Sequence, residues 1–214
     1  ILIYIMIAGI WGNDVIMPKD VSKDGYAISP YFKKYGLKDH DVVLEIDGKK
    51  IKDANSRNIN RNLMVRGVSE IKVLHSDGNT EIITFPEDLE YEILEEGAPF
   101  SEWSSPVVSD FDPSLDNAKK AGIHIGDSII KIGNNKVQSL SEMRYFLSKE
   151  IDNNIPITVI RNGDKLIIED VKVSQKGTIG FKSKIDQPEI THLDYGFTES
   201  ITEGLSQGYW TIHD

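Results

Sequence analysis

The chain carries two copies of one sequence unit, and this repeat constrains the fold more than any other feature. The run 122–132, GIHIGDSIIKI, corresponds to the run 36–46, GLKDHDVVLEI, which begins 86 positions earlier (122 − 36). Asp127 in the second copy stands at the position of Asp41 in the first. A period of this length is too long for a solenoid repeat and suits a small domain that is present twice.

Each copy predicts a mixture of helices and strands. In both copies a short Lys-rich segment ends at a Gly, which suits the left-handed residue after a helix C-terminus. Apolar and polar residues alternate in 44–46 and in 130–132, as a half-buried strand requires. The window 139–147 has the capping-box spacing and the apolar period of a helix. The segments 71–84 and 157–168 each contain two apolar runs around a turn, which predicts a hairpin.

This order of elements resembles a PDZ domain of the circularly permuted kind found in bacterial periplasmic proteases. The second copy keeps the pattern closely through Gly122, Gly126 and Asp127, whereas the first has His40 where the second has Gly126. Two such domains in tandem, with an apolar segment before them and an amphipathic one after, look like the periplasmic region of RseP-type site-2 proteases. The resemblance covers essentially the whole chain and implies an α+β fold of two small, partly open β-barrels, each with two helices.

The resemblance also implies a division of the chain. We expect the end of a transmembrane helix at 1–12, a first PDZ domain at 13–90, a linker at 91–102, a second PDZ domain at 103–184, and a linker with an amphipathic juxtamembrane helix at 185–214. The acidic run 87–96 reads as a solvated connector.

The two flanking segments suggest contact with a membrane. Residues 1–11 carry no charge but supply only about half of the ~20 residues that a membrane-spanning helix needs. A buried first strand or the remnant of a signal peptide are the alternatives for this run. Apolar residues recur with helical spacing at Phe197, Ile201, Leu205 and Tyr209, which predicts an amphipathic helix. The alternative for this helix is ordinary packing on the second domain.

Composition and motifs exclude several classes of function. A net charge of −10 opposes nucleic-acid binding, which needs clustered Lys and Arg. The absence of cysteine excludes disulfides, thiolate metal sites and a cysteine nucleophile. None of the five histidines belongs to an H-E-x-x-H motif, and no Gly-x-Ser-x-Gly elbow is present. We therefore expect no cofactor and no catalysis in this chain, while the resemblance implies zinc in the parent protein, held by residues outside the chain.

A binding function remains, in which an extended peptide adds as a strand beside a helix. In the second domain the expected groove residues are Val107, Val108, Ser109, Met143, Phe146 and Leu147. In the first they are Tyr26, Ala27, Ile28, Ile59, Leu63 and Met64. Ile179, Gly180 and Phe181 are the nearest match to the family's carboxylate-binding loop, although they depart from its usual order. The same apolar residues would also suit a plain core.

The leading interpretation is a non-catalytic region that binds peptides and gates substrates for a membrane-embedded zinc metalloprotease. The resemblance implies regulated intramembrane proteolysis of anti-sigma factors or signal-peptide remnants, at the bacterial inner membrane with the PDZ domains on the periplasmic side. Its partners would be membrane-protein substrates or their extracytoplasmic C-terminal peptides, and the lipid bilayer at both ends of the region. The alternatives are a membrane-tethered PDZ adaptor and the regulatory PDZ tail of a soluble periplasmic serine or tail-specific protease.

Overall fold

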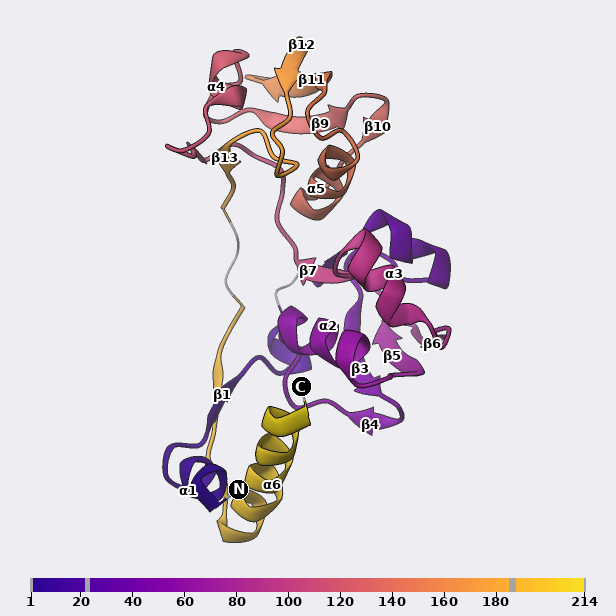
Figure 1. Ribbon diagram of the computed structural model, residues 1–214, viewed down its shortest axis with the longest axis vertical. Helices are drawn as coiled ribbons and strands as arrows, with labels where there is room; N and C mark the ends of the chain where they lie inside the picture. Colours follow the sequence, from indigo (N-terminus) through magenta and orange to yellow (C-terminus); the bar gives the residue numbers. More distant parts are fainter. Residues whose placement is uncertain (1, 22–23, 185–187, 214) are drawn as a thin grey trace.

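The computed structural model describes residues 2–21, 24–184 and 188–213. Ile1 of the expected transmembrane segment, residues 185–187 of the second expected linker and Asp214 lie outside the described residues. Two units of mixed helices and strands are stacked along the long axis of the molecule, and a pair of helices, α1 and α6, lies at the end nearer the first unit (Figure 1).

The first unit extends from strand β2 to strand β7. Its elements are β2 (Tyr26–Ile28), η2 (Pro30–Tyr35), β3 (Val42–Ile46), β4 (Lys49–Lys50), α2 (Ser56–Val65), β5 (Glu70–Leu74), β6 (Thr80–Thr84), α3 (Leu89–Glu96) and β7 (Phe100–Glu102). Four strands form an antiparallel sheet in the order β4-β3-β5-β6, and β2 pairs separately with β7.

The second unit repeats this topology. Its elements are β8 (Asp110–Phe111), α4 (Asn117–Lys120), β9 (Ser128–Ile132), β10 (Asn135–Lys136), α5 (Leu140–Ser148), β11 (Asn154–Arg161), β12 (Asp164–Lys172) and β13 (Phe181–Lys182). The sheet order β10-β9-β11-β12 matches that of the first unit, and β8 pairs with β13 as β2 pairs with β7. The repeat in the sequence is therefore also a repeat in the order of the strands.

Each unit has its own apolar core, and residues predicted as a linker belong to the first of them. Leu89 and Ile93, on α3, are buried, and so is Phe100 on β7. Residues 91–102 are therefore not an extended connector, and the interpretation of 87–96 as solvated was wrong. The buried leucine and isoleucine are four positions apart, about one helical turn, a signal that the surrounding glutamates obscured.

A fully buried aspartate occupies the same position in both units. The Asp127 carboxylate accepts hydrogen bonds from the backbone N–H of His124 and, at 2.7 Å, from Nε and Nη2 of Arg161. In the first unit Asp41 accepts from the backbone N–H of Lys38, and His75 Nδ1 donates to it at 2.6 Å. Lys38 and His124 are equivalent in the repeat, and so are His75 and Arg161. Each unit therefore holds the loop before its central strand by the same kind of contact to a buried aspartate.

The backbone at position 126 is left-handed, which explains why glycine stands there. Gly126 has φ 92°, and His40, its counterpart, has φ 72°, a conformation that costs energy for a residue with a Cβ. The His40 ring compensates through Nδ1, which is 2.6 Å from the carbonyl oxygen of Asp24, and through contact with the Trp103 ring at 4.1 Å between centroids. The first copy thus keeps the turn despite its departure from the motif.

The helix pair at the end of the molecule is α1 (Leu2–Trp11) with α6 (Phe197–His213). A short ladder of β1 (Asn13–Val15) with β14 (Thr191–Leu193) continues from it, and η1 (Pro18–Asp20) leads into the first unit. The two helices approach closely at small residues, because a Cβ on Gly204 would lie 2.4 Å from the Cα of Ile5. Ser200 of α6 is buried in the same contact, next to Gly9 of α1, and Ala8 is fully buried.

Residues 2–11 are therefore a helix and not the alternative buried strand. No helix among the described residues is both long and apolar enough to cross a membrane. The predicted amphipathic helix is present, but its apolar face remains uncovered, with Phe197 85% and Tyr209 50% exposed.

We predict a pH dependence that separates the two buried aspartates. Asp41 and then Glu81 raise the pKa of His75 above its ordinary 6.5, and burial raises the pKa of the Asp41 carboxyl above its ordinary 3.8. A histidine whose pKa is higher in the folded state stabilises the fold fully at pH values below its unfolded pKa. The stabilisation from His75 is therefore lost as pH rises above 6.5 and through the folded-state pKa. Urea unfolding of the full chain should show stability falling as pH rises above about 6.5.

The matched variant is His75→Arg, which copies Arg161 of the second unit and stays charged throughout this range. It should remove most of the decline. An unchanged decline in His75→Arg would show that other groups cause it. Burial alone would raise the pKa of Asp127, but the hydrogen bonds from Arg161 outweigh it and lower that pKa below its ordinary 3.8. The Asp127–Arg161 contact should therefore weaken only in acid, as pH falls from 3.8 through the lowered pKa.

Candidate functional site

A groove of about 310 Å³ lies in the second unit between helix α5 and the strand β13 with the loop before it. The lining residues are Leu140, Met143, Arg144 and Leu147 from α5, and Thr178, Ile179, Gly180, Phe181, Lys182 and Ser183 from the loop and strand. Three of the four lining residues from α5 are apolar, and the loop with β13 forms the other wall. This is the arrangement in which an extended peptide can lie between a helix and a strand.

Helix α5 presents its apolar side to the groove because its start is fixed. Ser139 is the N-cap, and its hydroxyl accepts a hydrogen bond from the backbone N–H of Glu142 at 3.2 Å, as the capping-box spacing predicts. Met143 and Leu147, one turn apart, are 4% and 1% exposed. They form the floor of the groove and are also part of the core, so their replacement would disturb folding as well as binding.

Strand β13 leaves one backbone edge facing α5. On its other side, the carbonyl oxygen of Gly180 accepts from the backbone N–H of Asp112, and that of Lys182 accepts from Ser109. Backbone groups of successive residues point to opposite sides of a strand. The N–H and C=O of Phe181 therefore point toward the groove, where a ligand strand can pair with them.

The loop before β13 requires glycine. Gly180 has φ 89°, and a Cβ there would lie 1.9 Å from the carbonyl oxygen of Leu115. Gly177, with φ 66°, begins the same loop next to Ser148 of α5. The loop thus brings its backbone close to the end of α5, at the place where a terminal carboxylate would meet backbone N–H groups.

The structure places the predicted groove residues in two regions. Met143 and Leu147 meet the predicted loop residues Ile179, Gly180 and Phe181 in the groove, while Phe146 packs partly buried against the core. Val107, Val108 and Ser109 lie elsewhere, in a separate hollow of about 460 Å³ that also contains Trp103 and Ile125.

The prediction that Val107–Ser109 form the edge strand was therefore wrong. This segment leads into β8, which is covered on one side by β13, so the strand that faces α5 comes from the C-terminal end of the unit. The loop sequence TIGF at 178–181 was the signal that could have located the strand edge facing α5. Its position near the C-terminal end of the unit departs from the family's usual order and argued against this assignment. Arg144 and Lys182 also line the groove and were not predicted.

The corresponding space of the first unit is closed by a side chain. Asn60 of α2 donates from Nδ2 to the carbonyl oxygen of Phe100 at 2.7 Å, and its Oδ1 accepts from the Phe100 N–H at 3.0 Å. Ser56 of the same helix donates to the Glu102 carboxylate at 2.7 Å. Helix α2 is thus bonded directly to β7, the counterpart of β13, at the backbone groups that a ligand would use.

The predicted groove residues of the first unit are mostly core residues. Tyr26, Ala27 and Ile28 form β2, which is buried and paired with β7. Ile59 and Leu63 are buried beneath α2. Met64 is 42% exposed on the surface of α2.

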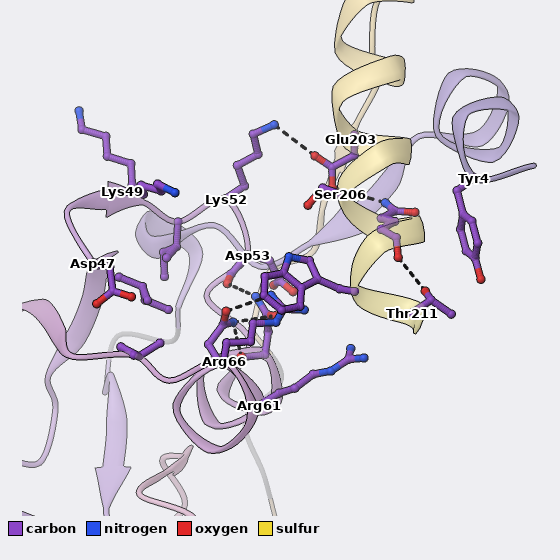
Figure 2. Close-up of a pocket in the computed structure, with 18 residues that line it drawn as sticks. Tyr4, Asp47, Lys49, Lys52, Asp53, Arg61, Arg66, Glu203, Ser206 and Thr211 are labelled. Atoms are coloured by element: carbon purple, nitrogen blue, oxygen red, sulfur yellow. Dashed lines mark hydrogen bonds and ion pairs between the residues drawn. The ribbon is translucent and has the colours of Figure 1, made fainter. Parts of the chain in front are cut away.

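A third hollow, a cleft of about 650 Å³, separates the first unit from α6 (Figure 2). Lys52 reaches across it to Glu203 at 3.4 Å, and the Arg66 guanidinium lies 4.0 Å from the centre of the Trp210 ring. The carboxylate of Asp53 accepts from backbone N–H groups at the edge of the cleft. Lys52 and Glu203 therefore already pair across this cleft, which lies at the contact between α6 and the first unit.

Among the described residues, no three His, Cys, Asp or Glu side chains come together as a metal site.

Residues 99–173 match the PDZ domain family. The match begins within the last elements of the first unit and ends before β13, so the groove strand itself lies beyond it. No curated protein matches the chain. The chain therefore contains a PDZ domain, which implies a peptide-binding or regulatory function.

We predict that Asn60 contributes to stability whereas Arg144 does not. Asn60→Ala removes both partners of the Phe100 backbone, and leaving part-buried polar groups unpaired should cost about 1–3 kcal/mol of unfolding free energy. Arg144 occupies the same place in α5, five residues after the N-cap, but is exposed and makes no hydrogen bond or ion pair within the described chain. Arg144→Ala, the matched control, should change stability by less than about 0.5 kcal/mol in urea unfolding.

Equal losses in the two variants would show that the Asn60 contact does not hold α2 against β7.

Proposed function

We propose that the second unit binds the C-terminal end of an extended polypeptide in the groove between α5 and β13. The observation that carries this proposal is the open backbone edge at Phe181, opposite the apolar floor of Met143 and Leu147. The ligand would add as a strand to β13 and place its terminal carboxylate at the loop 177–180. The PDZ domain at residues 99–173 supports a function of this class.

The first unit has a different role in this proposal. Its strand order supports a second, circularly permuted PDZ domain, but Asn60 occupies the edge of β7 in the way a ligand backbone would. We propose that this unit is a structural support that sets the position of the peptide-binding unit. Lys33 supports this, since its ammonium group lies 2.8 Å from Glu142 at the start of α5.

We further propose that the chain is the periplasmic substrate-gating region of an RseP-type site-2 protease, located at the bacterial inner membrane. The α1–α6 pair supports contact with a bilayer, because many apolar side chains on its outer surface are uncovered. Exposed apolar residues on it are Leu2, Ile3, Met6, Ile7, Ile10, Trp11, Phe197, Leu205, Tyr209 and Ile212. Patches of this kind on a surface mark protein or membrane contacts.

The protease role places the chemistry elsewhere in the parent. The described residues offer no cluster suited to zinc, so we propose that the catalytic zinc is held outside this chain. Membrane-protein substrates would meet the two units before they reach it. A membrane-tethered adaptor would share the apolar helix pair but would not alter cleavage. In the full-length parent, a blocked groove should change which substrates are cleaved.

The peptide-binding proposal is tested by NMR titration of the full chain with short peptides that end in an apolar residue. Backbone signals of 178–183 and 140–147 should shift, because these two segments contain the residues that line the groove. The corresponding segments of the first unit, 56–65 and 97–102, should not shift. Peptides with an amidated C-terminus should bind more weakly, since they lack the terminal carboxylate.

Shifts spread evenly over both units, or absent from 178–183, would contradict the assignment of the groove.

The membrane proposal is tested by thiol labelling with a membrane-impermeant reagent. The chain contains no cysteine, so single-cysteine variants report single positions. Ile10→Cys and Leu205→Cys should label in solution and become protected when phosphatidylcholine vesicles are added, because both side chains are exposed on the apolar pair. Glu169→Cys, exposed on β12 of the second unit, should label equally with and without vesicles. Unchanged labelling at all three positions would remove the bilayer from the proposal.

A further inference from the structure

The two units differ at one helix position that faces the strand edge. Counted from the N-caps Asn55 and Ser139, Asn60 and Arg144 occupy the same place on α2 and α5. The buried residues align in the same way, since Ile59 corresponds to Met143. Asn60 bonds to the backbone of β7, so a side chain at this place is directed toward the groove strand.

Arg144 cannot close the second groove as Asn60 closes the first. A guanidinium group donates hydrogen bonds but cannot accept them, whereas the amide of Asn60 does both. The N–H of Phe181 therefore stays available to a ligand even when Arg144 turns toward β13. The difference of one residue converts a closed edge into an open one.

The open groove is positively charged in a chain whose net charge is −10. None of the described residues that line it is Asp or Glu, and two are cations. Lys182 has Asp110 at 3.9 Å, but Arg144 makes no ion pair with any described residue. An anionic group on the ligand would supply the missing partner, and a planar guanidinium binds a carboxylate through two parallel hydrogen bonds.

We infer that the ligand of this groove is a peptide with an acidic side chain near its C-terminus, and that Arg144 selects it. The inference rests on the proposed peptide-binding function and names its substrate class. The ligand backbone pairs with Phe181, an apolar side chain lies over Leu140, Met143 and Leu147, and an Asp or Glu side chain meets Arg144.

The test compares short peptides that differ only in one residue, Glu, Gln or Lys, placed in turn at each position before an apolar C-terminal residue. Fluorescence anisotropy with the full chain should show one position at which Glu binds about tenfold more tightly than Gln, the effect of one charge-assisted contact. Arg144→Gln should abolish this preference without weakening the Gln peptide. Arg144→Glu should instead favour the Lys peptide at the same position.

Lys136→Gln is the matched control, because Lys136 is an exposed cation on β10 outside the groove lining. It should leave the preference for Glu unchanged. An equal loss of preference in Lys136→Gln would indicate a general charge effect and overturn the role of Arg144.

A second variant, Arg144→Asn, tests the closed and open states directly. It installs the residue type that closes the first unit, so all peptides should lose binding and the unfolding free energy should rise. In Arg144→Gln the new side chain is one methylene longer than asparagine, so this variant should still bind the Gln peptide. Peptides that shift the groove signals without regard to charge would overturn this inference alone, whereas failure of every peptide to bind would overturn the proposed function.

Discussion

Both units depend on the pairing between their first and last strands. Strand β7 returns from the end of the first unit to pair with β2, and β13 returns to pair with β8 in the second. This pairing closes each core and also fixes which strand edge faces the neighbouring helix. The groove is a consequence of that closure, because the last strand uses one edge to complete the fold and keeps the other.

One side chain decides what happens to the remaining edge. In the first unit Asn60 satisfies both backbone groups of Phe100, so the helix and strand are joined by the chain itself. In the second unit the helix offers a cation that cannot satisfy an N–H donor. A duplicated fold thus provides two units with the same strand order, of which one is sealed and one is accessible.

Contacts at both ends of α5 link the accessible groove to the sealed unit. Lys33 of η2 lies 2.8 Å from Glu142 in the first turn of α5, and Lys149 just after the helix lies 2.6 Å from Glu96 of α3. The groove helix is therefore held between its own core and the neighbouring unit. Exposed ion pairs contribute little individually, so the positioning arises from having one at each end of the helix.

The sequence by itself determined the repeat, the alternation of strands, the capped start of α5 at Ser139 and the paired aspartates. These features depend on local periodicity and on residue types that have few other uses, such as Gly in left-handed turns. Only the tertiary structure decided that α3 belongs to the first core, that β13 and not Val107–Ser109 is the edge strand, and that Asn60 closes the first groove. Each of these depends on strands far apart in the chain, because a backbone edge becomes open or covered only when its distant partner is in place.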